Sequence, residues 1–450
     1  MAISPAQGPV AVTDQAVEAG GRFSHAARAL RHRNFKLFVS GQSISLIGTW
    51  MTRLATSWLV YRLSHSALLL GVVGFSGQIL TFLLAPFAGV WIERMDRRKI
   101  LVWTQALAAV QSLALAALTL AGVINIWEII ALSLFQGLIN AFDMPGRQAF
   151  IVQMVESRED LRNAIGINSS MVNSARLIGP ALAGLVIAAW GEGWCFLIDG
   201  VSYFAVIASL LMMRLKPIEH RRATASMLEQ MREGWSYVSS FVPIRTVLTM
   251  FAVLSLMGWP YAVLLPIFAG KVLHGGPNTL GWLTGASGVG ALTAALALTL
   301  RKSVVGLTKS IQRAAAMFGA GLILFGFSHT LWLSLLMMLV VGYGMMLGLG
   351  GSNIIIQTLV PEDKRGRVMS YYTMAFVGMA PFGSLLAGGL AHWIGASHTV
   401  MISGACCLLG CGWFTLKLPE VRKVMRPIYE EMGLIRDPGE PVMEDHAGTS

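Results

Sequence analysis

The sequence has few charged residues, because only 13% of its 450 positions are Asp, Glu, Lys or Arg. An average soluble protein carries about 25% charged residues. So few charges could not build the surface of an ordinary soluble enzyme of this length, and that class is excluded. Hydrophobic residues make up 55% of the chain. Since one membrane span needs about 20 mostly apolar residues, the length has room for roughly a dozen spans.

The sequence is also poor in cysteine and in the motifs of cofactor-dependent chemistry. Of its four cysteines, Cys406, Cys407 and Cys411 share one apolar segment and Cys195 stands alone. Their spacings fit neither a disulfide framework nor a zinc site, so we expect no metal and no other cofactor. None of the nine histidines falls in the middle of a predicted span, which makes a histidine proton relay improbable. The absence of a G-x4-G-K-[ST] loop argues against direct use of ATP.

Long apolar segments indicate an all-α membrane protein with twelve transmembrane helices. The predicted spans are residues 35–61, 67–92, 99–122, 125–146, 162–188, 193–214, 243–269, 279–300, 309–328, 331–357, 368–391 and 396–416.

One long gap divides these spans into two six-helix halves. We predict an N-terminal leader at 1–33, an N-terminal half at 34–214, a linker at 215–242, a C-terminal half at 243–417 and a tail at 418–450. The leader has no continuous apolar stretch and is therefore not a signal peptide. The halves also resemble each other weakly, since G-P-A-L-A-G in the first corresponds to G-S-L-L-A-G in the second. Two pseudo-symmetric halves suit an alternating-access transporter with its site at their interface.

The basic residues predict the orientation in the membrane. If the N-terminus is inside, only Arg62 and Lys271 of the 34 Lys and Arg residues fall on the outer side, and Arg53 and Arg176 fall within spans. The positive-inside rule then predicts cytoplasmic termini in a multi-pass protein of the cell inner membrane. The net charge of +11 is explained by this topology and not by a nucleic-acid site.

The segment G-V-W-I-E-R-M-D-R-R-K after the second span resembles the major facilitator superfamily signature G-x-x-x-D-R-x-G-R-R. The matching residues are Gly89, Arg94, Arg97 and Arg98. Glu93 and Asp96 stand where the family usually has Asp and Gly. The resemblance implies a cytoplasmic gate, and an ion-pair latch that breaks on switching agrees with it. The alternative is a basic loop that only follows the positive-inside rule.

The fifth span resembles the antiporter signature G-x8-G-x3-G-P-x2-G-G of the same superfamily. The matching residues are Gly166, Gly179, Pro180 and Gly184. Ala175 and Ala183 replace two glycines and keep the small-residue face. The resemblance implies export, and the alternative is generic packing of small residues.

Finer motifs resemble the enterobactin-exporter-like facilitators, a subgroup with siderophore exporters and macrolide or drug efflux pumps. They are F-D-M-P-G-R-Q-A-F from Phe142, N-S-A-R-L-I-G-P-A-L-A-G from Asn173 and R-G-R-V-M-S from Arg365. The resemblance implies an ion- or proton-coupled exporter of a small amphiphilic molecule. Many proton-coupled drug exporters carry R-x-x-Q-G on the fourth helix, where this sequence has Ser133 in place of the Arg. This difference argues against proton coupling through that arginine.

Polar and aromatic residues within the spans are candidates for a substrate cavity. Arg53 lies deep in the first span on a polar stripe, a pattern typical of a cavity-lining helix. The predicted cavity residues are Gln42, Thr49, Arg53, Gln136, Asn140, Trp259, Tyr261 and Asn353. Trp259 and Tyr261 could stack on a flat cargo. The alternatives are that Arg53 snorkels outward and that the aromatic residues are bundle core.

Three charges lie deep within spans. We expect Asp199 to pair with Arg53 or Arg176, because an isolated buried charge is costly. A proton-carrying role is the alternative for Asp199. Nearer the cytoplasmic mouth, we predict gate contacts from Asp143, Arg147, Arg365 and Arg367.

Other functions share parts of this pattern. A lysolipid flippase or a metabolite importer would have the same fold. An intramembrane enzyme is less favoured, because G-F-S-G and G-A-S-G occur in corresponding spans and are better explained by helix packing. A membrane sensor would need a sizeable soluble domain, and the sequence shows none. The expected partners are the lipid bilayer and a small molecule, with no nucleic acid, for a monomeric transporter and not an enzyme.

Overall fold

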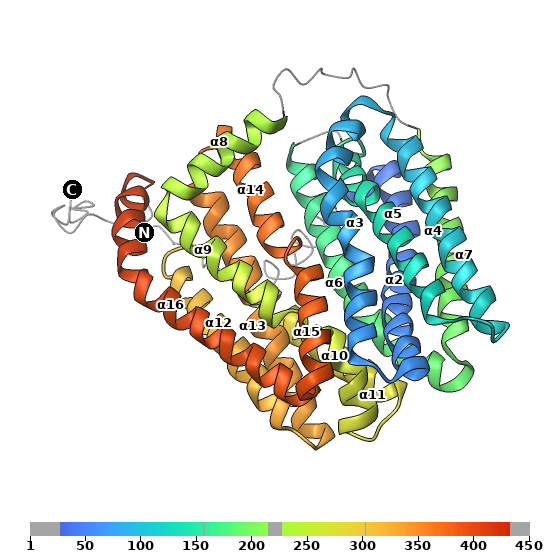
Figure 1. Cartoon of the computed structure of the whole chain (residues 1–450). Helices are drawn as coiled ribbons and strands as arrows, with labels where there is room; N and C mark the ends of the chain where they lie inside the picture. The colour runs from blue at the N-terminus through green and yellow to red at the C-terminus, as the bar shows by residue number, and fades with distance from the viewer. Residues whose placement is uncertain (1–27, 156–157, 215–226, 302, 433–450) are drawn as a thin grey trace, which may run out of the picture.

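A computed structural model describes residues 28–155, 158–214, 227–301 and 303–432, which fold into helices (Figure 1). The first half begins with a 3-10 turn and continues with six long helices. Their bounds are η1 Arg28–Arg31, α2 Arg33–Ser64, α3 Ala67–Arg94, α4 Arg97–Leu120, α5 Ile126–Ile151, α6 Arg158–Trp190 and α7 Glu192–Met212. Short polar caps separate them. Asp96 accepts hydrogen bonds from the first backbone amides of α4, and Asn125 forms a capping box with Glu128 at the start of α5.

The second half has more interruptions. Its helices are α8 Met227–Ser240, α9 Val242–Val253, α10 Tyr261–Ile267, α11 Pro277–Thr299, α12 Leu307–Phe327, α13 Leu331–Leu359, α14 Glu362–Phe376, α15 Ala380–Ile394 and α16 Ala396–Glu431. Two π-helical turns, η2 Leu254–Gly258 and η3 Phe268–Val272, extend α9 and α10 into one bent span. They lie next to Pro260 and Pro266, which cannot donate the backbone hydrogen bonds of a regular helix.

Eleven spans in the described part are long and apolar enough to cross a membrane. The eleven do not include α2, which has 32 residues but carries Arg53 and a polar stripe. At about 1.5 Å per residue, α2 still exceeds the ~30 Å of a hydrocarbon core. With α2 as the twelfth span, the predicted count is supported.

The last helix is longer than the sequence indicated. We predicted that the final span ends near residue 416 and that a separate tail begins at 418, whereas α16 continues to Glu431. Val421, Met425 and Tyr429 are buried and pack in the same apolar cluster as Val238 of α8. Packing against the C-terminal half therefore extends the helix beyond the membrane-spanning length.

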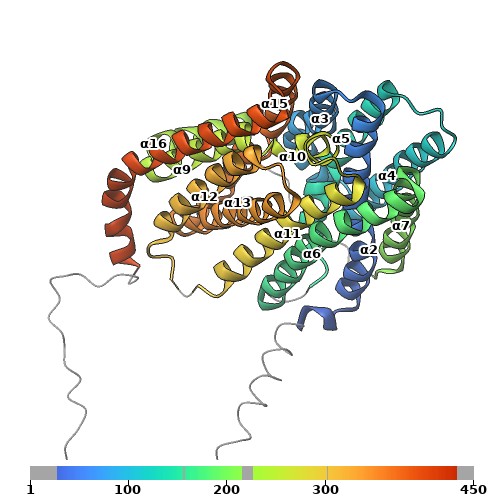
Figure 2. The same cartoon turned by 90° about the horizontal axis from the view of Figure 1, so that it is seen from below.

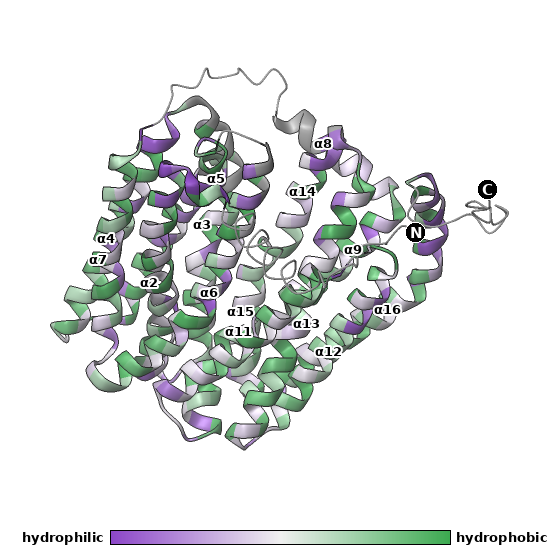
Figure 3. Cartoon of the chain, turned by 180° about the vertical axis from the view of Figure 1, so that it is seen from behind, coloured by the Kyte–Doolittle hydropathy of each residue, from purple (hydrophilic) through white to green (hydrophobic). Residues whose placement is uncertain are grey.

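The two halves meet along two pairs of helices, α3 with α15 and α6 with α11 (Figures 1 and 2). These contacts run toward the end of the bundle that carries the turns at His65, Gly191 and Gly395, which we call the far end. The opposite end carries α8 and is called the linker end. Hydrophilic residues gather toward the linker end (Figure 3). This arrangement places α6 against α11 of the second half.

Candidate functional site

Two arginines and two tryptophans form a cluster where the halves meet. The Cζ of Arg53 on α2 lies 4.8 Å from the centre of the Trp50 ring. The Cζ of Arg176 on α6 lies 5.7 Å from the Trp50 ring and 5.4 Å from the Trp259 ring. Arg176 also reaches the Sδ of Met345 on α13 at 3.8 Å. We call these five residues the arginine–tryptophan cluster, and cation–π attraction stabilises it.

The predicted ion pair of Asp199 is not formed in this structure. Its carboxylate accepts a hydrogen bond from Ser112 at 3.0 Å and one from Thr49 at 3.5 Å. Neither Arg53 nor Arg176 lies within 4 Å of an acidic oxygen among the described residues. Hydroxyl groups of α2 and α4 surround Asp199, which is 1% exposed, and this is why no guanidinium is needed as its hydrogen-bond donor.

The other predicted cavity residues of the N-terminal half divide into two groups. Gln42 is buried within the half, and Thr49 bonds Asp199 and Tyr203. Gln136 and Asn140 of α5 are half-buried and hydrogen-bonded to each other at 3.2 Å.

In the C-terminal half, Asn353 accepts a hydrogen bond from Gln357 one turn later on α13, at 2.5 Å. This amide pair matches the one on α5. Tyr261 is not on a cavity surface, because it is 5% exposed and hydrogen-bonds Ser287 of α11. The ring packs against Phe318, as the bundle-core alternative predicted.

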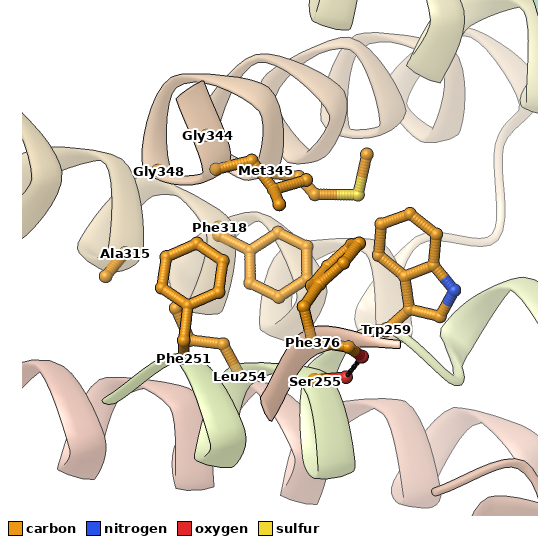
Figure 4. Close-up of a pocket in the computed structure, with 11 residues that line it drawn as sticks. Phe251, Leu254, Ser255, Trp259, Ala315, Phe318, Gly344, Met345, Gly348 and Phe376 are labelled. Atoms are coloured by element: carbon orange, nitrogen blue, oxygen red, sulfur yellow. Dashed lines mark hydrogen bonds between the residues drawn. The ribbon is translucent and has the colours of Figure 1, made fainter. Parts of the chain in front are cut away.

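An apolar pocket opens beside Trp259 in the C-terminal half (Figure 4). Aromatic side chains line it, and the polar group of Ser255 donates its hydrogen bond to the carbonyl of Phe376. The lining residues are Phe251, Leu254, Ser255, Trp259, Ala315, Phe318, Gly344, Met345, Gly348, Leu349 and Phe376. Trp259 and Met345 belong both to this pocket and to the arginine–tryptophan cluster, so the two are adjacent.

The signature segment begins within α3 and is described only in part, because the surroundings of Gly89 and the side chains of Glu93 and Arg94 lie outside the described residues. Arg97 donates to the carbonyl of Ala149 on α5 at 3.0 Å. Arg98 donates to the carbonyl of Leu211 on α7 at 2.6 Å. Helix C-termini have unpaired carbonyls, so Arg98 caps α7 as well as tying it to α4.

Asp143 of α5 is the centre of a buried polar network. It accepts hydrogen bonds from Thr104 at 3.0 Å and from Gln105 at 2.7 Å, both on α4, and it pairs with Arg147. These bonds join α4 to α5 within the N-terminal half, and none of them reaches the C-terminal half. The gate role that we predicted for Asp143 and Arg147 stays a prediction.

One of the two corresponding residues in the second half, Arg367, contacts the predicted linker. Arg367 of α14 forms an ion pair with Glu233 of α8, and Arg365 donates to the carbonyl of Val360 at 3.4 Å. The linker is therefore joined to the C-terminal half through α14.

The antiporter-like residues of α6 pack on two different partners. A Cβ on Gly179 would meet the carbonyl oxygen of Ile47 on α2 at 2.9 Å, and one on Gly184 would meet the carbonyl oxygen of Pro277 at 3.0 Å. Gly166 has open space around it. Pro180 lies between the two contact positions, and its carbonyl oxygen would be 2.9 Å from a Cβ on Gly281. Small residues here permit the close crossing of α6 with α2 and α11.

Sequence reasoning missed Trp50 as a member of the site. It precedes Arg53 by three positions, and residues at this spacing are neighbours on a helix. It also missed an anchor for the leader, in which the Asp160 carboxylate lies 3.1 Å from Arg28 Nε and 3.0 Å from His32 Nε2. No local pattern indicated this contact, because Asp160 is more than 120 positions from His32.

Substituting Asp160 by Ala is expected to release η1 from α6. A loss of about 1–2 kcal/mol would raise the population of the released form by about 5- to 30-fold. Limited trypsin digestion of the purified protein, with the product ends identified by mass spectrometry, measures cleavage after Arg28 and Arg31. The control is Glu420→Ala, which removes an exposed ion pair with Lys417. Equal cleavage rates in the two variants would show that Asp160 does not anchor the leader.

The sequence is similar to known proteins over most of its length. Residues 24–430 match the transmembrane secretion effector family. The staphyloferrin A transporter of Staphylococcus aureus is 25% identical over 370 residues, covering 82% of this chain and 92% of that protein. The multidrug efflux pump Tap of Mycolicibacterium fortuitum is 24% identical over 387 residues, covering 84% and 93%.

A solved structure has a similar fold. It is a bacterial homologue of the human lysosomal transporter Spinster in an inward-facing, unoccupied conformation. The TM-score is 0.66 at 12% sequence identity, and the match covers 87% of this chain and 96% of that one.

Proposed function

The chain belongs to the transmembrane secretion effector family of the major facilitator superfamily, and from this premise we propose that it exports a small amphiphilic molecule across the cell inner membrane. The transport is secondary active, coupled to an ion or proton gradient, and proceeds by alternating access of one central site. The similarity to the multidrug efflux pump Tap supports an outward direction. The arginine–tryptophan cluster carries the proposal structurally, because it draws residues from both halves.

We infer that the structure corresponds to the inward-facing state. The close approaches between the halves lie from the middle of the bundle to the far end. A Cβ on Gly71 would meet the Ser384 carbonyl at 2.6 Å, and one on Gly281 would meet Gly184 Cα at 3.2 Å. With the termini in the cytoplasm, as the positive-inside rule predicts, the far end is extracellular and closed.

Export can be tested in cells that lack their own efflux pumps. Expression of the chain is expected to lower the accumulation of an amphiphilic dye several-fold, and an uncoupler is expected to abolish the difference. Siderophore release and macrolide accumulation are measured in parallel to identify the cargo class. Unchanged accumulation of every compound would refute the exporter, and increased accumulation would indicate import.

Two substitutions connect export to the site. Arg53→Ala removes a guanidinium from the cluster, and Asp199→Asn removes the buried charge that holds Ser112 and Thr49. Each is expected to return dye accumulation to the level of cells without the chain while membrane insertion is kept. Arg422→Ala, on an exposed position of α16, is the matched control with full transport expected. Full transport activity in both site variants would show that Arg53 and Asp199 have a purely structural role.

A further inference from the structure

The two guanidiniums of the site have donors but no protein acceptor of comparable strength. An arginine carries five N–H donors and no acceptor. Among the described residues, Arg53 has no hydrogen-bond partner within the protein, and the only partner of Arg176 is the weakly accepting sulfur of Met345. The side chain of Arg53 is exposed, even though the residue lies in the middle of α2. The site therefore presents unused cationic donors between the halves.

Asp199, the acidic residue predicted to pair with these arginines, accepts no hydrogen bond from either of them. Asp199 is buried behind Thr49, with its two oxygens directed to hydroxyl groups of α2 and α4. Asp143 is paired with Arg147, closer to the linker end. Both acids are thus occupied inside the N-terminal half, and the charges of Arg53 and Arg176 remain for a ligand.

Aromatic rings hold the guanidiniums in place. Arg53 and Arg176 both lie over the Trp50 ring, and Arg176 also lies over Trp259. Stacking on a ring face leaves the N–H edge of a guanidinium available, and that edge matches a carboxylate through two parallel hydrogen bonds. The tryptophans therefore hold the arginines in an orientation suited to binding an anion, but they do not supply the negative charge of an anion.

Building on the proposed function, we propose that the exported molecule is an organic anion whose carboxylate binds between Arg53 and Arg176. Its apolar part lies on Trp259 and extends toward the pocket lined by Phe251, Phe318 and Phe376 (Figure 4). The carboxylate supplies the charge that the protein lacks at this point. A cationic molecule of the same shape is disfavoured, because two guanidiniums repel its charge.

Three fluorescent probes of similar size test the charge preference: dansylglycine as the anion, dansylglycinamide as the neutral molecule and dansylethylenediamine as the cation. Binding is measured by dansyl emission with the full chain in lipid nanodiscs. The anion is expected to bind at least about tenfold more tightly than the amide, the difference that one charge-assisted hydrogen bond of 1.5–3 kcal/mol supplies. Equal affinity of the anion and the amide, or tighter binding of the cation, would overturn the proposal.

Variants assign the preference to the arginines. Arg53→Gln and Arg176→Gln should each remove most of the difference between anion and amide, and Arg53→Lys should keep part of it. Arg422→Gln makes the same charge change outside the site and should keep all of it. Thermal unfolding in the same nanodiscs shows that each variant is folded. An undiminished preference in both folded Gln variants would refute the assignment.

Cell accumulation of the same probes separates this inference from the export proposal. If the chain binds dansylglycine through its arginines but does not lower the accumulation of the probe in cells, the anion site is supported and the export proposal is refuted. Equal export of all three probes by the wild type and by both Gln variants would support the exporter and refute the anion site.

Discussion

Substituting Gly71 by Val is expected to abolish export while the protein still inserts into the membrane. A Cβ at this position would lie 2.6 Å from the Ser384 carbonyl oxygen and 2.9 Å from Gly388 Cα. Both atoms belong to the backbone of α15, so no side-chain rotation relieves the clash. Overpacking of this kind costs about 1–3 kcal/mol. If this cost opposes closure of the far end, it shifts the conformational equilibrium by about 5- to 150-fold.

A spectroscopic distance and a matched glycine test this expectation. Spin labels on cysteines that replace Trp127 of α5 and Trp393 of α15, both highly exposed, report the separation of the halves at the far end. The distance should increase in Gly71→Val and stay constant in Gly77→Ala, since no atom lies within 4 Å of a Cβ at Gly77. Normal export and an unchanged distance in Gly71→Val would show that this crossing is not a seal.

Substituting Asp143 by Ala is expected to give the largest loss of stability. The change would leave Arg147, Thr104 and Gln105 without their shared acceptor in a site where Asp143 is 3% exposed. Removing one partner of a buried ion pair costs about 3–5 kcal/mol, because the remaining charge is uncompensated. Thermal unfolding of the purified protein and its yield from membranes measure the effect.

Two further variants distinguish charge from packing in this network. Asp143→Asn retains an acceptor oxygen for Thr104 and Gln105, so it should be less harmful than Asp143→Ala. Glu430→Ala removes a more exposed i,i+4 pair with Arg426 on α16, and exposed pairs contribute about 0–1 kcal/mol. A melting temperature that is equally lowered by Glu430→Ala and Asp143→Ala would contradict the central role of Asp143.

Much of the fold was predictable from the sequence. A membrane-spanning helix must be apolar over about 20 residues and satisfies its backbone hydrogen bonds internally, so each span leaves a local pattern. The family resemblance likewise depended on short segments such as that at Gly89. The helical extension of α16 to Glu431 was not predictable in this way, because it is stabilised by packing of Val421, Met425 and Tyr429 into the apolar cluster of the C-terminal half.

The same distinction between local pattern and tertiary packing applies to the candidate site. The sequence by itself determined that Arg53, Arg176 and Asp199 stand inside long apolar segments, and their depth in the membrane is a prediction from that position. Only the tertiary structure decided their partners. Asp199 bonds Ser112, 87 positions away, and Arg176 meets Met345, 169 positions away. Such partners depend on how helices pack, and no pattern within one helix records which side chain the neighbouring helix presents.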